Sequence, residues 1–448
     1  MTLRGFATRV LQPFLLGVAV SAAILAFWSR LPVCAGGESD PLLAAAQAFR
    51  RPAAIPVPAA DQPNPARIAL GHALFRDTRL SRDGSRSCAS CHDPALAFTD
   101  GVARGKGIAG TPLARNTPHL WNLAWGETFF WDGRAGSLEA QARGPIENPL
   151  EMGQDLEVAT RLMAGDEALR RHFAEAFPGE SGPAAGQVLR ALAAWERTLV
   201  SPPTRFDRFA EGDPVALDVR ERAGFGLFLG KAGCVSCHSG WAFTDRAYHD
   251  VGLPGTDPGR AAIIGLPATE HAFRTPGLRE LAWTAPYMHD GSLPSLEAVV
   301  DHYAGGMVSR PSLSPDLPRL ALTPDEREAL VAFLGTLSSE DPPAPASLAA
   351  ETPVRGPAVA TATGRIVSQK DKMFLPGAAT LREGEQLVVV NDDGRTHNVR
   401  LDGDGVAFDS GAQEPGQTVR IPFAHAGAYR VYCGIHPAMQ LTVTVLAR

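Results

Sequence analysis

The sequence contains one five-residue pattern twice, as Cys88-Ala-Ser-Cys91-His92 and as Cys234-Val-Ser-Cys237-His238. Cys-x-x-Cys-His is the attachment signature of a c-type haem, in which the cysteines form thioethers with the porphyrin and the histidine ligates the iron. Each copy is followed by Phe-Thr-Asp, at 98–100 and 243–245, which argues against two chance matches. A zinc site would need further ligands nearby, and a redox dithiol does not require the histidine. The pattern therefore predicts two covalently bound haem c groups.

The chain has 448 residues, which is enough for about three domains. It is 45% hydrophobic and 20% charged, values that are ordinary for a globular protein. The net charge of −6 argues against a general nucleic-acid-binding surface, so we expect no nucleic-acid partner.

The N-terminus has the features of an export segment. Arg4 and Arg9 precede an apolar run, 10–28, and the small residue Ala35 follows at a suitable cleavage point. The apolar run is also long enough to be an uncleaved membrane anchor. We therefore predict that 1–35 is a signal peptide or an N-terminal anchor. Both alternatives place the folded protein in the periplasm, with membrane contact only through the anchor.

The segments that precede the two haem motifs resemble each other. Gly71 with Leu74-Phe75, and Gly224 with Leu227-Phe228, suggest a repeated helix that leads into each motif. Apolar spacing predicts another helix at 187–199, and Thr323 with Glu326 forms a capping box at the start of a further one. We expect two mainly α cytochrome c-like domains, at 41–205 and 206–338, each holding one haem.

The pattern changes after a Pro/Ala-rich linker, predicted at 339–357. β-Branched runs separated by turn residues predict strands, at 387–391, 418–421, 429–432 and 441–445. The sequence therefore predicts a third, all-β domain at 358–448.

The all-β domain contains the residue types of a blue-copper centre. Cys433, His436 and Met439 are spaced as Cys-x-x-His-x-x-Met, and His397 follows an earlier predicted strand. Such a centre uses two imidazoles, a thiolate and a weak axial thioether. The alternative is a free buried cysteine with incidental histidines. The domain resembles small cupredoxins of the amicyanin, pseudoazurin and plastocyanin group. That resemblance implies a Greek-key sandwich, one type 1 copper and a role in electron transfer.

The region 65–340 resembles the bacterial di-haem cytochrome c peroxidase and MauG family. The matching stretches follow one another through the region: 74–81, Arg115-Asn116-Thr-Pro118, 130–135, 144–152, Phe206-Asp207 and 284–291. The resemblance implies two cytochrome c-like domains, with peroxide reacting at the first haem and electrons stored at the second.

The resemblance also implies roles for three residues. Glu151 matches the acid–base residue that moves a proton between the peroxide oxygens, and Gln141 matches the glutamine that orients the oxidant. Trp131 matches a tryptophan between the haems that relays electrons. The alternatives are a solvated loop carboxylate for Glu151 and a core aromatic for Trp131, which could serve both purposes.

Two positions depart from the peroxidase pattern. The loop 105–110 has no histidine, whereas many peroxidases carry one there that caps the first iron until reduction. We therefore expect the first haem to react without prior reduction. Tyr303 lies where the peroxidases have a methionine and the MauG type has a tyrosine, so it is the expected distal ligand of the second haem. A phenolate would lower the potential of that haem. His302 and Met307 are the neighbouring alternatives.

The family also holds a calcium ion between the haem domains. Its ligands map onto the side chain of Asn116 and the carbonyl groups of Thr284 and Pro286, and oxygen donors suit this ion. Arginines that could pair with haem propionates, or equally lie on a solvated face, are Arg115, Arg134 and Arg260. We expect the remaining histidines to be surface or structural residues: His72, His119, His172, His249, His271, His289 and His425.

These features predict an oxidoreductase of the cytochrome c peroxidase type. It would reduce hydrogen peroxide with electrons from a small redox donor protein, a cytochrome c or a cupredoxin, delivered through the copper domain. One alternative is a MauG-like enzyme that oxidises a protein partner through high-valent iron. The other is a non-enzymatic electron carrier with several redox centres.

Overall fold

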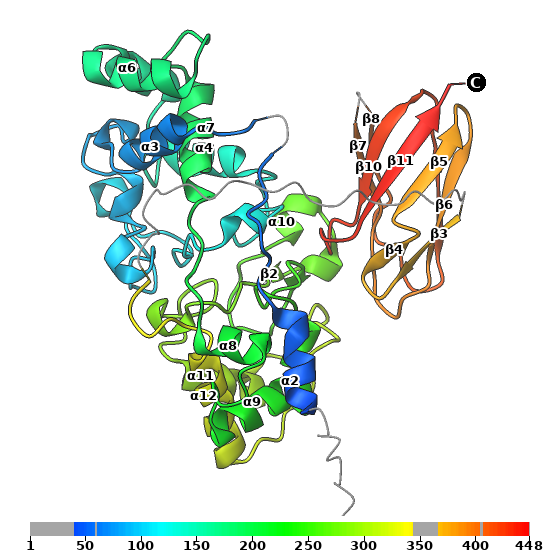
Figure 1. Ribbon diagram of the computed structural model, residues 1–448. Helices are drawn as coiled ribbons and strands as arrows, with labels where there is room; N and C mark the ends of the chain where they lie inside the picture. Colours follow the sequence, from blue (N-terminus) through cyan, green and yellow to red (C-terminus); the bar gives the residue numbers. More distant parts are fainter. Residues whose placement is uncertain (1–39, 59–60, 344–365, 404–405, 448) are drawn as a thin grey trace, which may run out of the picture. The chain divides into compact units, whose positions relative to one another are not determined.

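The computed structural model describes residues 40–58, 61–343, 366–403 and 406–447 (Figure 1). The predicted export segment, 1–35, and most of the predicted linker, 339–357, lie outside the described residues. Within the described part of the chain, no helix is both long and apolar enough to cross a membrane.

The region that carries the two haem motifs is built from helices and long loops. Its helices are α2 (Pro41–Ala46), α3 (Pro65–Leu74), α4 (Leu138–Glu147), α5 (Leu156–Ala164), α6 (Glu167–Ala176), α7 (Ala185–Glu196), α8 (Arg205–Glu211), α9 (Val219–Leu229), α10 (Ala261–Ile264), α11 (Leu296–Asp301) and α12 (Pro324–Gly335). One two-stranded sheet pairs β1 (Tyr248–His249) with β2 (Phe273–Arg274).

The internal repeat predicted from the sequence corresponds to a repeated helix crossing. A Cβ added at Gly71 in α3 would lie 1.9 Å from the carbonyl oxygen of Ala191 in α7. A Cβ added at Gly224 in α9 would lie 1.9 Å from the carbonyl oxygen of Ala329 in α12. In each haem unit, the helix that enters the motif therefore meets the backbone of a later helix at a glycine, where a side chain would prevent the approach.

The helix ends follow local sequence signals. The predicted capping box at α12 is present, with Thr323 and Glu326 bonding reciprocally to each other's backbone N–H. Helix α7 begins two residues before the predicted start and ends at Glu196, three residues before the predicted end. Leu199 is nevertheless buried, because the chain beyond α7 continues along the same core.

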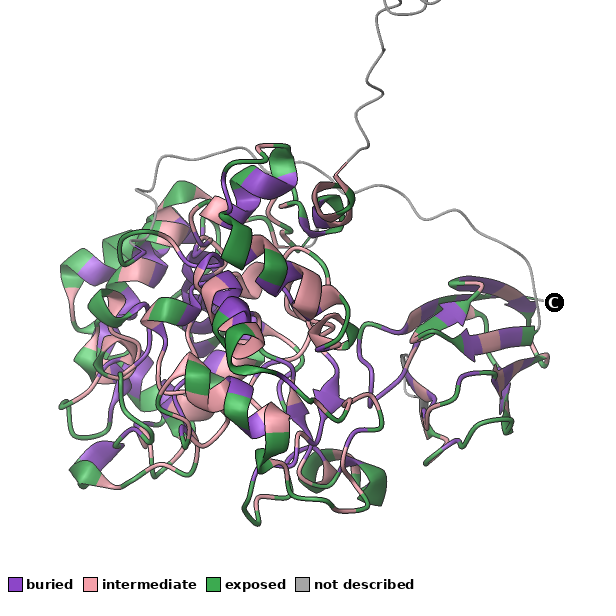
Figure 2. Ribbon diagram, turned by 90° about the horizontal axis from the view of Figure 1, so that it is seen from below, coloured by how far each residue is buried: buried purple, intermediate pink, exposed green. Residues whose placement is uncertain are grey.

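The C-terminal region is a β-sandwich, as the sequence predicts. Its strands are β3 (Ile366–Lys370), β4 (Met373–Leu375), β5 (Ala378–Arg382), β6 (Gln386–Asn391), β7 (Arg400–Gly403), β8 (Val406–Asp409), β9 (Thr418–Pro422), β10 (Gly427–Tyr432) and β11 (Gln440–Leu446). One sheet has the order β5-β11-β10-β7-β8 and the other β4-β3-β6-β9. Buried and exposed residues alternate along β11, a pattern expected of a strand with one face on the core (Figure 2).

Candidate haem and copper sites

The two haem motifs adopt the same local structure. Each begins with a short 3-10 turn, at Cys88–Ser90 and at Cys234–Ser236. The Nδ1 atom of His92 lies 3.0 Å from the carbonyl oxygen of Phe98, and Nδ1 of His238 lies 2.9 Å from that of Phe243. With Nδ1 as the donor, Nε2 of each ring is left as the lone-pair nitrogen for iron. The repeated Phe-Thr-Asp thus supplies the carbonyl that orients each histidine.

Tyr303 lines the cavity that contains the second haem motif, together with Cys234, Cys237 and His238. The apolar face of α11 lines the same cavity, as its spacing predicts, with Leu296, Val299 and Val300. A π-helical turn, His302–Gly306, follows α11. Burial raises the pKa of the Tyr303 phenol, and the nearby thiols of Cys237 and Cys234 raise it further. The phenol is therefore close to the haem attachment residues.

The two alternative ligands of the second haem, His302 and Met307, make contacts with a different segment of the chain. Nε2 of His302 lies 2.9 Å from the carbonyl oxygen of Val251 and the side chain is buried. Met307 packs against Gly252, where an added Cβ would lie 2.9 Å from the Met307 Cβ. This geometry favours Tyr303 over both neighbours.

Glu151 lies near the first haem motif on a well-anchored segment. The Asn148 side-chain amide donates to its carboxylate at 2.7 Å, and Ile108 N–H donates to its carbonyl oxygen at 2.8 Å. Burial raises the pKa of Glu151, while the bond from Asn148 and the charge of Arg134 oppose that rise. Burial also raises the pKa of the Cys91 thiol, with a smaller contribution from the negative charge of Glu151. Gln141 is half-buried on α4.

Trp131 and the three predicted calcium ligands line one cavity with the second haem motif. These residues are Asn116, Trp131, Thr284 and Pro286. The indole N–H of Trp131 donates to the carbonyl oxygen of Asn116 at 2.9 Å, which fixes the ring. Thr99 and Thr117, from the segments after the first motif, line the same cavity. A calcium ion at Asn116, Thr284 and Pro286 stays a prediction.

Three of the four predicted copper residues, His397, Cys433 and His436, bring their ligand atoms together in the C-terminal domain. Cys433 Sγ lies 3.8 Å from Nδ1 of His397 and 3.7 Å from Nδ1 of His436, and the two Nδ1 atoms are 3.0 Å apart. His397 and Cys433 are fully buried. Met439 is also buried, and its carbonyl oxygen accepts a hydrogen bond from Cys433 N–H at 3.1 Å. Two imidazoles and a thiolate that converge in this way suit a type 1 copper ion.

Two family models match the chain. Residues 65–215 match the model of the di-haem cytochrome c peroxidases, and residues 362–446 match that of copper-binding proteins of the plastocyanin/azurin family. The methylamine utilization protein MauG of Methylorubrum extorquens is 48% identical over 309 residues, which cover 68% of this chain and 88% of that protein. The chain belongs to the di-haem cytochrome c peroxidase and MauG family.

Further relatives agree with this assignment. The cytochrome c551 peroxidase of Nitrosomonas europaea is 35% identical over 293 residues, which cover 64% of this chain and 84% of that protein. A solved structure of a MauG-like protein associated with microbial copper homeostasis superposes with a TM-score of 0.60 at 32% identity, covering 65% of this chain and 95% of that one. The chain is therefore an oxidoreductase of this family that binds haem c and copper, and the prediction of a non-enzymatic carrier is not supported.

The predicted copper ligands of this chain have polar neighbours. Nε2 of His397 lies 3.2 Å from an Asp393 carboxylate oxygen, which leaves Nδ1 on the side of Cys433. Gly434 N–H donates to the side-chain oxygen of Asn398 at 2.6 Å. His436 N–H donates to Cys433 Sγ at 3.4 Å. These contacts hold the ligands in place before a metal binds.

Sequence reasoning missed two buried residues between the haem region and the copper loop. Arg260, considered as a propionate partner or a solvated residue, is 4% exposed and donates to backbone carbonyl groups. His249, expected to be surface or structural, is 8% exposed and bonds to Asp245 and Ser314. The partners of Arg260, and Ser314 beside His249, are distant in the sequence, so no local pattern could have shown that these two residues are buried at this place.

Proposed function

We propose that this protein is a periplasmic peroxidase that reduces hydrogen peroxide to two waters, using two protons and two electrons delivered through its copper domain. The first haem supplies the iron at which the O–O bond breaks. Glu151 holds the proton that moves from one peroxide oxygen to the other, and Gln141 orients the peroxide. A small redox protein, a cytochrome c or a cupredoxin, is the proposed electron donor.

The observation that carries this proposal is the environment of Glu151. Its carboxylate is partly buried, hydrogen-bonded by Asn148, and close enough to the first haem motif to act on Cys91. A raised pKa suits a group that must both accept and return a proton near neutral pH. Trp131, held by its bond to Asn116, is the proposed relay for electrons that arrive from the second haem.

A MauG-like function is the second candidate, and it rests on Tyr303. The phenol faces the second haem cavity, and a phenolate ligand stabilises oxidised iron more strongly than a thioether does. The 48% identity to a methylamine utilization protein also favours it. In that case the enzyme would draw electrons from a protein partner, and peroxide would supply the oxidising equivalents.

Steady-state turnover separates the two candidates. The holoprotein should consume peroxide catalytically with a reduced small cytochrome c or cupredoxin as the donor. Cys433→Ser should slow that turnover and leave the direct reaction of peroxide with the haems unchanged. If no donor supports turnover, while peroxide-treated enzyme oxidises a protein partner, the MauG-like function is correct. Unchanged donor turnover in Cys433→Ser would mean that copper does not lie on the electron path.

A further inference from the structure

The copper loop is covered by the haem region. Its residues from Cys433 to Pro437 are all buried, including the ligand His436, which is 5% exposed. Tyr248 N–H donates to the carbonyl oxygen of Ile435 at 3.3 Å. The guanidinium group of Arg260 donates to the carbonyl oxygen of Gly434 at 2.9 and 3.1 Å. The copper ligand loop is therefore bonded by backbone and side chain to residues of the second haem domain.

Arg260 also connects the loop to the first haem domain. One of its nitrogen atoms donates to the carbonyl oxygens of Asp132 and Gly133, at 2.9 and 3.0 Å, directly after Trp131. The guanidinium lies over the Tyr248 ring, 4.3 Å from its centroid. The buried Arg260 side chain therefore bonds to carbonyl groups of the copper loop and of the first haem domain, and it stacks on Tyr248 of the second haem domain.

His249 lies between the copper ligand and the second haem motif. Its ring centroid is 6.3 Å from that of His436. A ring nitrogen of His249, a carboxylate oxygen of Asp245 and the sulfur of Cys237 all lie within 4.8 Å of one another. Nε2 of His249 bonds to Asp245 at 3.0 Å and Nδ1 lies 3.2 Å from the Ser314 hydroxyl, so both nitrogens are occupied. Since the Cys237 sulfur carries the haem, this cluster is a contact to the haem edge and not a further metal site.

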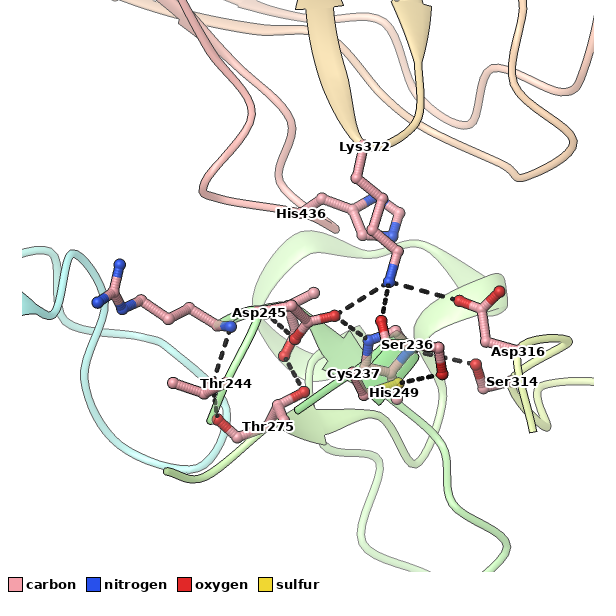
Figure 3. Close-up of polar contacts among 12 residues, drawn as sticks. Ser236, Cys237, Thr244, Asp245, His249, Thr275, Ser314, Asp316, Lys372 and His436 are labelled. Atoms are coloured by element: carbon pink, nitrogen blue, oxygen red, sulfur yellow. Dashed lines mark hydrogen bonds and ion pairs between the residues drawn. The ribbon is translucent and has the colours of Figure 1, made fainter. Parts of the chain in front are cut away.

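Ion pairs surround this contact (Figure 3). Lys372, in the turn between β3 and β4, reaches across with its ammonium group 3.0 Å from an Asp245 carboxylate oxygen and 3.1 Å from the carbonyl oxygen of Ser236. The same ammonium lies 3.5 Å from Asp316, which also pairs with Arg395 of the sandwich. Two cations of the copper domain thus face two carboxylates of the second haem domain.

We infer that the copper face of the sandwich is a built-in electron-transfer interface, in which Lys372 and Asp245 hold His436 against His249 and the haem-bearing Cys237. Tunnelling between redox centres weakens steeply with distance, and this arrangement leaves one histidine ring between a copper ligand and a haem attachment residue. The step moves one electron: copper(I) is oxidised to copper(II) and the ferric iron of the second haem is reduced to ferrous, with no bond made or broken. The inference rests on the proposed function only in requiring copper and haem at their predicted sites.

His249 is the positioning residue to test. In the full-length holoprotein, a single electron is injected by flash photolysis, and the copper–thiolate band and the second haem band are followed together. His249→Leu should slow electron exchange between the two centres at least about tenfold, because the substitution removes the aromatic ring that lies between the copper ligand and Cys237. His425→Leu, at an exposed histidine of the sandwich, is the control and should exchange electrons at the wild-type rate.

Lys372 tests whether its ion pair holds the copper domain against the second haem domain. Lys372→Glu should increase hydrogen exchange at the Tyr248 amide at least about tenfold, since a charge-assisted bond is lost and a repulsion is added. This readout does not depend on enzyme activity. Lys370→Glu makes the same charge change at an exposed position two residues away and should leave that amide protected. Lys372→Glu should also slow electron exchange.

The outcomes separate this inference from the proposed function. Electron exchange within about twofold of wild type in both variants, with amide protection unchanged in Lys372→Glu, would overturn the interface. Fast electron exchange that depends on His249, in a protein that does not turn over peroxide, would support the interface and reject the peroxidase function.

Discussion

At the scale of single residues, the chemistry depends on how the chain surrounds each functional group. Glu151 is partly buried, so its pKa is raised, and the bond from Asn148 limits that rise. His92 and His238 each have Nδ1 bonded to a phenylalanine carbonyl oxygen, so their other nitrogen is available to iron. In the two histidines, the nitrogen left for iron is therefore set by a bond made at the other nitrogen of the ring.

Glu151→Gln should abolish most peroxide turnover while both haems stay bound. General acid–base catalysis contributes about 10²- to 10⁴-fold, and the amide cannot transfer the proton. Because the carboxylate must be ionised to accept a proton, the wild-type rate should fall as pH drops through the raised pKa of Glu151, and the variant should lose that dependence. Stopped-flow rates across pH measure both effects. The control is Glu147→Gln, which changes an exposed carboxylate on α4 and should turn over peroxide at the wild-type rate. A near-wild-type rate in Glu151→Gln would show that Glu151 is a loop carboxylate without a catalytic role.

Tyr303→Phe should change the ligation of the second haem, because the phenol oxygen is the proposed distal ligand. We expect a high-spin signal from that haem, or a new low-spin signal if a neighbour replaces the phenol. Electron paramagnetic resonance of the resting protein distinguishes these states. Met307→Leu is the control and should leave the spectrum unchanged. An unchanged spectrum in Tyr303→Phe would identify His302 or Met307 as the native ligand.

At the scale of helices and loops, glycines allow the backbone to pack closely around the two haem motifs. The crossings at Gly71 and Gly224 set the distance between the helix that enters each motif and the later helix that supports it. The loop 105–110 packs on the Glu151 segment, and a Cβ added at Gly107 would lie 1.6 Å from the Leu150 carbonyl oxygen. These contacts are between backbones, so they depend on the absence of a side chain.

Gly224→Ala should destabilise the second haem domain. The added methyl would overlap the Ala329 carbonyl oxygen, and overpacking of this kind costs about 1–3 kcal/mol. Gly226→Ala, on the same helix, has its nearest atom at 3.8 Å and should stabilise by up to about 1 kcal/mol through helix propensity. Thermal unfolding of the holoproteins compares them. Equal melting temperatures for the two variants would show that α9 does not approach α12 as closely as described.

The first haem should react with peroxide in the resting ferric enzyme. The loop 105–110 carries no histidine that could cap the iron, and its backbone is fixed against the Glu151 segment by the bond from Ile108 N–H. The resting spectrum should therefore contain one high-spin, five-coordinate haem. Mixing with peroxide, without prior reduction, should change the spectrum of that haem. Two low-spin haems that are silent until reduction would contradict this.

At the scale of the whole molecule, the sandwich and the haem region share a buried boundary. Leu266, from the loop after α10, packs into the apolar core of the sandwich together with Ile264. Glu127 of the first haem domain pairs with Arg430 of β10 at 3.6 Å. The copper domain is therefore held by apolar, ionic and backbone contacts and not by the linker alone.

Residues 358–448 expressed alone should bind one copper ion and be blue when oxidised. The predicted ligands His397, Cys433, His436 and Met439 all belong to the sandwich, so the copper site needs no residue of the haem region. The isolated domain should be less stable than in the full chain, because Leu266 and Ile264 no longer cover its core. Visible absorption measures the thiolate–copper band, which should vanish on chelation of copper and in Cys433→Ser. A colourless copper-loaded domain would contradict a type 1 site.

The sequence by itself determined the groups whose parts lie close together in the chain. The two Cys-x-x-Cys-His motifs, the Cys433–Met439 loop and the capping box at Thr323 are set by local spacing, which folding does not alter. The repeat at Gly71 and Gly224, and the strands around the copper loop, follow from local patterns as well. The family resemblance added Glu151, Gln141, Trp131 and Tyr303, whose roles stay predictions.

Only the tertiary structure decided how these centres are connected. Arg260 and the Lys372–Asp245 pair bond segments more than a hundred residues apart, and the His249 ring lies beside that of His436. In the sequence each is an ordinary histidine or charged residue. The contact of His302 also needed the fold, since its ring nitrogen is bonded to the Val251 carbonyl group; Tyr303 as the distal ligand stays a prediction. Burial and partners beyond one helical turn come from packing between elements, and packing is not encoded in local spacing.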